Sequence, residues 1–142
     1  DYKIHEYEHN ASSESYGLEA VVKLNVPEAQ VFKTLVVRLN NNELALGIIP
    51  VSSMLGMKLI AKTVGAKKAE MATQIEAERS TGYIMGGVSP LGQKKKLKTI
   101  IDSSAKNLTT IYVSAGKRGL EIELCPLDLK NLTNAVFADI TQ

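Results

Sequence analysis

Two polar residues, Lys33 and Thr34, interrupt an otherwise apolar run over residues 31–37. Because neighbouring side chains of a strand point to opposite faces, Phe32 and Thr34 share one face, and Lys33 and Leu35 share the other. One of the two polar side chains must then point towards the interior. A buried ammonium has to be paired, line a wet cavity or lose its proton, although a lysine stem can also pack while its ammonium reaches water. The pattern leaves both a functional and a snorkelling Lys33 open.

The chain has one cysteine, Cys125, directly before Pro126 at the expected start of a helix. The positive end of a helix lowers a thiol pKa and favours the nucleophilic thiolate. Cys125 nevertheless follows the apolar run 120–124 and lacks the local signatures of cysteine hydrolases. We therefore expect it to pack as a small apolar residue.

Two histidines, His5 and His9, flank Tyr7 on one face of an expected strand. Residues four apart in a strand are separated by roughly 13 Å. Two imidazoles that bind one zinc must each approach it to about 2 Å. We therefore expect no shared metal here, and we expect Tyr7 to line a pocket.

The segment Gly87 to Gly92 has the glycine spacing of a phosphate-binding P-loop. Gln93 stands where that motif needs lysine, so nucleotide hydrolysis is not expected. The cations that follow this loop and a later turn fit either a solvated charge run or a rim that contacts phosphate or ribose. These cations are Lys94, Lys95, Lys96, Lys98, Lys117 and Arg118.

The 142 residues are enough for one domain with one core, and the composition, 44% hydrophobic and 23% charged, is typical of a folded soluble protein. A net charge of +2 is too small for a wholesale nucleic-acid-binding surface, so any basic site must be local. A single cysteine excludes an internal disulfide, and neither a secretory nor a membrane-spanning segment is predicted. This pattern favours the cytoplasm. The chain begins at Asp1, which we interpret as a missing leading segment.

Apolar periodicity predicts the elements that must position these residues. Branched apolar runs predict strands, and three asparagines at 40–42 predict the turn of a hairpin. Apolar residues at helical spacing predict short helices, the first of which Ser15 is suited to cap. The longest irregular stretch is 82–93, and such loops often carry sites. The expected strands are 2–9, 31–39, 44–51, 66–71, 99–102, 110–114, 120–124 and 136–140, and the expected helices lie around 18–26, 59–64, 76–80 and 126–132.

Strands interspersed with short helices, without regular alternation of the two, predict an α+β domain with a mixed sheet that curls into a barrel. Three segments also resemble one family closely: VFKTL at 31–35, STGYIMGGVSPLGQKK at 80–95 and IYVSAGKRG at 111–119. In this combination and order they resemble the YbaK proteins, bacterial Cys-tRNA(Pro) deacylases. The resemblance implies a single editing domain over residues 1–142, built as a mixed, mostly antiparallel β-barrel with flanking short helices and lacking the family's leading helix.

The resemblance also implies a site. By position, Lys33 is similar to the family's essential lysine, with a positioning and electrostatic role. The implied substrate-binding residues are Tyr7, Tyr16, Thr34, Gly86, Gly87, Ser114 and Glu121. This chain departs from the common family pattern at Tyr16, where phenylalanine is usual, at Glu121, where aspartate is frequent, and at Ala115, which replaces a glycine and so removes a positive-φ option.

The implied activity is trans-editing of Cys-tRNA(Pro), and of Cys-tRNA(Cys), in which the substrate's own thiol attacks the ester and no metal or cofactor is needed. The implied partners are the aminoacyl-tRNA and prolyl-tRNA synthetase, with no membrane. A synthetase pocket shaped for proline cannot strongly reject a side chain of similar size, so a second, correcting site is physically reasonable. Two alternatives stay open: editing of Ala-tRNA(Pro), and a non-catalytic RNA- or nucleotide-binding module.

Overall fold

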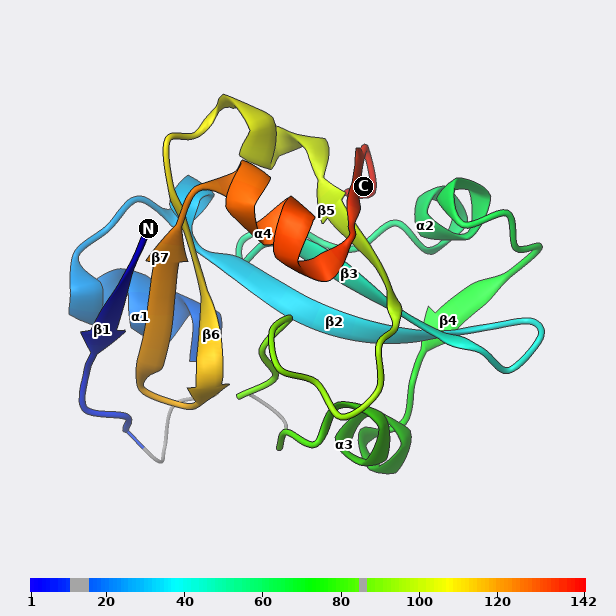
Figure 1. Cartoon of the computed structure of the whole chain (residues 1–142), viewed down its shortest axis with the longest axis horizontal. Coiled ribbons are helices and arrows are strands. Elements are labelled where there is room, and N and C mark those ends of the chain that lie inside the picture. The colour runs from blue at the N-terminus through cyan, green and yellow to red at the C-terminus, as the bar shows by residue number, and fades with distance from the viewer. Residues whose placement is uncertain (11–15, 85–86) are drawn as a thin grey trace.

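The computed structural model describes residues 1–10, 16–84 and 87–142, and within these ranges the backbone forms two β-sheets flanked by four α-helices (Figure 1). The α+β fold class is confirmed. Ser15, predicted as a helix cap, lies outside the described residues. No helix of the described chain is long and apolar enough to cross a membrane.

The larger sheet has five strands in the order β4-β2-β3-β5-β8. The predicted hairpin is present, because β2 and β3 pair antiparallel around the asparagine turn. β4 adds to β2 antiparallel, whereas β5 and β8 extend the other edge in parallel. The strands are β2 (Phe32–Leu39), β3 (Leu44–Pro50), β4 (Ala69–Met71), β5 (Lys98–Asp102) and β8 (Val136–Ala138).

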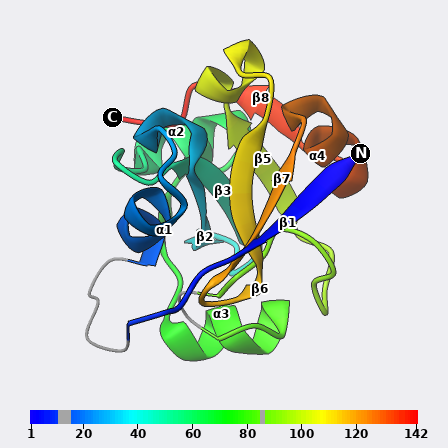
Figure 2. The ribbon, with the colours of Figure 1, turned by 90° about the vertical axis from the view of Figure 1, so that its left-hand side faces the viewer.

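The smaller sheet is antiparallel throughout, in the order β1-β7-β6, and faces the viewer in Figure 2. It consists of β1 (Tyr2–Glu6), β6 (Ile111–Lys117) and β7 (Leu120–Leu124). A parallel bridge between Val31 and Tyr112 connects it to the larger sheet. No ladder among the described strands joins the outer edges into a ring, so closure into a barrel stays a prediction.

The helices begin and end where local chemistry dictates. In α3, Thr73 and Glu76 form a reciprocal capping box, and Gly82 ends the helix with φ 81°. In α4, Pro126 occupies the first turn, and Asn134 ends the helix in the left-handed conformation. The helices are α1 (Tyr16–Leu24), α2 (Met57–Thr63), α3 (Gln74–Thr81) and α4 (Pro126–Thr133), with 3₁₀ turns at Glu28–Gln30 and Ser103–Asn107.

The central strands are buried on both faces. One apolar cluster, around Ile48 and Ile101, fills the space between the sheets and α4, and another, around Ile49 and Ile60, lies under α2. This two-sided burial explains why β2 and β3 read as continuous apolar runs.

Several predicted boundaries are wrong: the fourth strand begins at Ala69 and not at residue 66, the sixth ends at Lys117 and not at residue 114, and the first two helices each begin two residues early. Three further differences have a clear local cause. The first strand ends at Glu6 and not at residue 9, because the N–H of Tyr7 leaves the ladder to donate to the carbonyl of Gly119 (2.9 Å). The last strand ends at Ala138, since the N–H of Ile140 donates to Asp102 Oδ1 (3.0 Å). The third helix starts at Gln74, two residues early, because the capping box fixes its beginning.

Candidate active site

Lys33 is the second residue of β2, where it pairs with Ile49 on β3 beyond the reach of β4. Its side chain is half-buried, and no hydrogen bond or ion pair reaches it from the described residues. Burial lowers the pKa of Lys33 below its ordinary value. The ammonium therefore keeps its donors available for a ligand.

The bridge between β2 and β6 orients Lys33 towards the smaller sheet. Val31 and Tyr112 form this parallel bridge and pack in one apolar cluster with Ala20 of α1. Lys33 and Ser114 each lie two residues beyond the bridge, so both side chains project from the face that α1 covers. The structure thus places these two predicted site residues on one face; that they form one site stays a prediction.

Glu121 pairs directly with Ser114 across β6 and β7. Its side chain is only 7% exposed and receives no hydrogen bond from the described residues. Burial raises the pKa of Glu121 to about 7. The hydroxyl of Ser114 accepts a hydrogen bond from the N–H of Gly116 (3.2 Å), at a bulge in β6 where Gly116 takes φ 117°.

Tyr7 approaches the same place from the end of β1. Burial, with the charge of Glu121, raises the pKa of Tyr7 to about 12. The phenol therefore stays protonated and is a donor beside the Glu121 carboxyl. Its backbone is fixed by the bond to Gly119, where a Cβ would come within 2.7 Å of the Tyr7 carbonyl oxygen.

Gly87 contacts the other side of the turn between β6 and β7. A Cβ at Gly87 would lie 2.9 Å from the Cα of Lys117, so only glycine allows the loop to come this close. Thus one turn holds Tyr7 on one side and Gly87 on the other, at the end of the strands that carry Ser114 and Glu121.

Thr34 lies on the opposite face of β2 from Lys33, as alternation predicted. Its Oγ1 is buried and has no hydrogen-bond partner among the residues that the structure describes. The structure therefore does not bring Thr34 onto the face shared by Lys33 and Ser114. Gly86 and the side chain of Tyr16 lie outside the described residues. Ala115 has no positive φ; the neighbouring Gly116 takes that conformation.

Glu19 of α1 was not singled out from the sequence. Its buried carboxylate accepts from the N–H of Asn10 (2.8 Å) and bonds His9 Nδ1 (2.6 Å). Burial raises the pKa of Glu19, but these bonds and the charges of His9 and Lys23 outweigh burial and lower it. Glu19 ties the segment that follows Tyr7 to α1; its only sequence signal is an acid beside Ala20 on the inner side of the helix.

The geometry does not support the other sites that the sequence suggests: a metal site at the two histidines, a nucleophilic Cys125 and a P-loop. His5 bonds Glu123 (2.9 Å) whereas His9 bonds Glu19, and no three metal-binding side chains gather in the described chain. Cys125 is half-buried at the start of α4, at the end of β7 away from the β6–β7 turn. The P-loop-like segment follows a helix and precedes a strand, the reverse of what that motif requires.

Comparison with known proteins identifies the class to which this arrangement belongs. The family described as the aminoacyl-tRNA editing domain matches residues 14–132, and the chain belongs to that family. It is therefore an enzyme domain of the kind that removes amino acids from tRNA.

One related protein and two solved structures are similar to most of this chain. The chain is 42% identical over 137 residues to a protein of Enterococcus faecalis named "Putative Cys-tRNA(Pro)/Cys-tRNA(Cys) deacylase EbsC", with 96% of this chain and 84% of that protein covered. A solved structure described as "a putative trans-editing enzyme for prolyl tRNA synthetase" matches with a TM-score of 0.85 at 23% identity, covering 99% of this chain and 87% of the other. A hypothetical protein of known structure matches with a TM-score of 0.87, also at 23% identity, over 100% and 92% of the two chains. At these identities the two structures support the fold alone.

Proposed function

We propose that this chain releases cysteine from Cys-tRNA(Pro), and from Cys-tRNA(Cys), as a trans-editing enzyme that works beside prolyl-tRNA synthetase in the cytoplasm. The observation that carries the proposal is the unpartnered, half-buried Lys33 on the same face as Ser114 and the buried Glu121. The 42% identity to EbsC supports the choice of substrate.

An aminoacyl ester offers chemical groups that fit these side chains. Its α-ammonium group suits the buried Glu121 carboxylate, whose ionisation a neighbouring positive charge favours. Its carbonyl oxygen and its terminal ribose oxygens can accept hydrogen bonds from the Lys33 ammonium and the Tyr7 phenol. Backbone N–H groups near Gly87 suit the oxyanion that forms when the carbonyl is attacked. Lys33 then acts by position and charge, and not as a nucleophile.

The attacking group in this mechanism is the thiol of the substrate's own cysteine. Its sulfur forms a bond to the ester carbonyl carbon while the bond from that carbon to the ribose oxygen breaks. The thiol proton moves to the ribose oxygen, which becomes a hydroxyl, and the tRNA leaves without its amino acid. Water later opens the resulting cyclic thioester to free cysteine. This route needs no protein nucleophile, and it selects a thiol-bearing substrate by reactivity.

The test is release of the amino acid by the purified full chain from Cys-tRNA(Pro), Ala-tRNA(Pro) and the serine analogue. We expect release of cysteine only. Lys33→Ala should lower the rate by roughly 100-fold to 1000-fold, the loss typical of one electrostatic group at a developing oxyanion. Cys125→Ala is the matched control and should keep the rate of the unmodified chain.

Each part of the proposal has its own contradicting result. No release of any amino acid would reject the enzyme and favour a module that only binds RNA. Release of alanine but not cysteine would reject the substrate. Loss of activity in Cys125→Ala, or efficient release of serine, would reject attack by the substrate thiol.

A further inference from the structure

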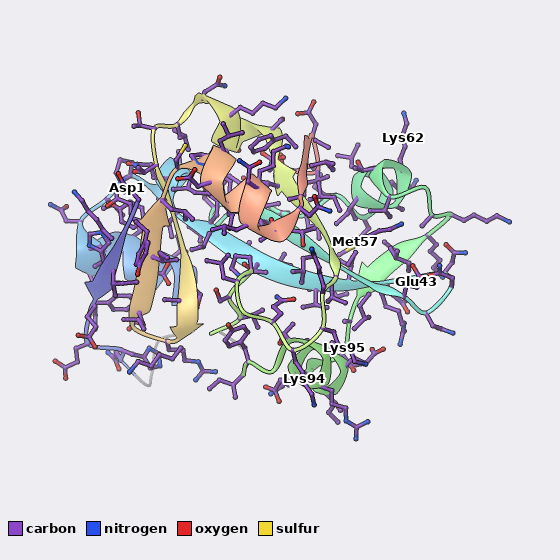
Figure 3. All side chains as sticks on the ribbon, viewed as in Figure 1. Asp1, Glu43, Met57, Lys62, Lys94 and Lys95 are labelled. Atoms are coloured by element: carbon purple, nitrogen blue, oxygen red, sulfur yellow. The ribbon has the colours of Figure 1, made fainter. Side chains whose placement is uncertain are left out.

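A polar cavity of about 500 Å³ lies at the turn end of the β2–β3 hairpin. The hairpin, the last turn of α3 and the start of β5 form its walls. We call it the basic cleft, after the cations among its lining residues: Arg79, Lys95, Lys96 and Lys98. Figure 3 shows Lys94 and Lys95 beside α3, well away from Lys62 on α2.

The cations of the basic cleft are available to a ligand. None of the four has an ion pair within the described chain. Of the two acids that line the cleft, Glu76 is already engaged, since its Oε1 accepts from Arg38 Nη1 (3.1 Å) and from the N–H of Thr73 (3.0 Å). The cleft therefore has an excess of positive charge.

The walls of the cleft are fixed by backbone hydrogen bonds. The N–H of Lys95 donates to the carbonyl of Ser80 (3.1 Å), and that of Lys94 donates to the carbonyl of Thr81 (3.0 Å). Lys98 pairs with Ala45 in the parallel ladder. The cations thus project from a preformed frame, which lowers the entropy cost of binding.

The position of the cleft relative to Lys33 limits what it can bind. Lys33 and Arg38 are five residues apart on β2, or about 17 Å along the strand, and their side chains point to opposite faces. Arg38 pairs with Leu44 at the cleft. One strand of a stacked nucleic acid advances roughly 3.4 Å per nucleotide. A nucleic-acid strand that passes round β2 from one face to the other therefore needs at least about five nucleotides. The loop that begins at Gly87 ends in the cleft, and in Figure 1 the tip of β6 and α3 share one edge of the molecule.

We propose that the basic cleft binds phosphate groups of the tRNA acceptor strand, at least about five nucleotides from the aminoacylated end. This inference rests on the proposed function. Unpartnered cations with the Asn42 and Ser80 side chains suit phosphodiester oxygens. The residues described around the cleft include no aromatic side chain on which a base would stack, so the contact is independent of sequence.

The test is binding of uncharged tRNA to the full chain, measured by fluorescence anisotropy over a range of salt concentrations. The variant Lys95→Ala/Lys96→Ala removes two exposed cations from the cleft, and Lys58→Ala/Lys62→Ala removes two exposed cations, one turn apart, from α2. Each phosphate contact contributes about 0.7 to 0.9 to the salt slope and roughly half a decade of affinity. We expect the cleft variant to bind roughly tenfold more weakly with a slope lower by about 1.5, and the α2 variant to bind like the unmodified chain.

A short oligonucleotide ending in CCA separates the cleft from the site at Lys33. The unmodified chain should bind tRNA more tightly than this oligonucleotide, and the cleft variant should lose most of that advantage. With aminoacylated tRNA, the cleft variant should show a raised KM for deacylation.

Equal binding of tRNA by the cleft and α2 variants would overturn the inference, even if deacylation is normal. Cleft-dependent binding of tRNA without any deacylation would support the inference and reject the proposed function. Equal competition by millimolar inorganic phosphate and by tRNA would identify a free-phosphate site and also overturn it.

Discussion

At the scale of single residues, burial without a partner is the common feature of the candidate site. Lys33 and Glu121 carry opposite charges when ionised, and burial shifts each pKa towards the neutral form. Tyr7 is held neutral by burial and by Glu121. Because these groups are shielded from water, an arriving charged substrate interacts with them more strongly than with solvated groups.

The first prediction concerns the pH dependence of stability due to Glu121. Its pKa is about 7 in the fold and 4.5 ordinarily, so between these values the folded chain binds the proton that the unfolded chain has lost. The contribution of Glu121 to the free energy of unfolding therefore falls as pH rises from about 4.5 to about 7, and is constant above that. Between pH 5 and pH 8 this loss is roughly 2 to 3 kcal/mol.

Glu121→Gln removes the titration while keeping the shape of the side chain. Urea denaturation at pH 5 and pH 8 should show that the difference in unfolding free energy between the two pH values becomes smaller by that amount in the variant. Glu28→Gln, at an exposed carboxylate of a 3₁₀ turn, is the matched control and should keep the original difference. An unchanged difference in Glu121→Gln would show that this carboxyl is ionised in the fold.

The second prediction concerns the buried, unpartnered hydroxyl of Thr34. Thr34→Val keeps the side-chain shape and removes a polar atom that lost its water without gaining a bond. We expect a gain of about 1 kcal/mol in the free energy of unfolding. If Thr34 also binds substrate, the same variant should lose deacylase activity while it gains stability. A loss of stability would instead reveal a hydrogen bond that the hydroxyl makes in solution.

These two residues mark what the sequence could predict about the site. Alternation alone correctly predicted that Lys33 and Thr34 point to opposite faces. It did not predict that Glu121 is buried opposite Ser114, because the pairing of β6 with β7 decides which residue of each strand faces its neighbour. It also missed Arg79 in the basic cleft, since α3 and β5 meet only through long-range packing.

At the scale of elements, local patterns predicted nearly every strand and helix, and tertiary contacts decided their ends. The asparagine turn and the branched runs predicted the β2–β3 hairpin. No local signal predicted that β5 would add to β3 in parallel, or that the strands would divide into two sheets. Such pairings depend on how separate apolar faces share one core.

The third prediction concerns the β6–β7 turn as the element that organises the site. Gly119 has φ 88°, and its Cβ position lies 2.7 Å from the Tyr7 carbonyl oxygen. Gly119→Ala adds both a left-handed alanine and a contact with backbone, so it should lower the unfolding free energy by roughly 3 kcal/mol. It should also reduce deacylation, because Tyr7 must move.

Gly65→Ala provides the matched control for that change. Gly65 has a similar φ of 74°, but nothing lies within 4 Å of its Cβ position. This variant should lose only about 1 kcal/mol, from backbone strain, and should keep its activity. Equal losses of stability in the two variants, measured by urea denaturation, would show that the turn does not depend on close contact with Tyr7.

At the scale of the whole molecule, strand β1 is much less buried than the central strands of the larger sheet. Ile48, Ile49 and Ile101 of the larger sheet are fully buried, whereas Tyr2 and Ile4 on β1 are 67% and 52% exposed. Strand β1 has one neighbour, β7, and the segment after it is held by Glu19 and Gly119. The candidate site is therefore assembled at the border between a well-packed sheet and a strand with little packing of its own.

The fourth prediction follows from this difference and concerns native-state hydrogen exchange. Amides of β3 and β5 should exchange only through global unfolding, whereas amides of β1 should exchange through a local opening of lower free energy. A ligand that contacts Tyr7 binds only the folded chain with β1 closed, so a non-hydrolysable aminoacyl-adenosine analogue should raise the opening free energies of β1 and β3 by the same amount and leave the gap between them unchanged. The measurement is the opening free energy of the amides in β1 and β3, obtained from their exchange rates with and without the analogue. If β1 and β3 exchange with the same free energy without the analogue, the two sheets unfold as one unit and the prediction is wrong.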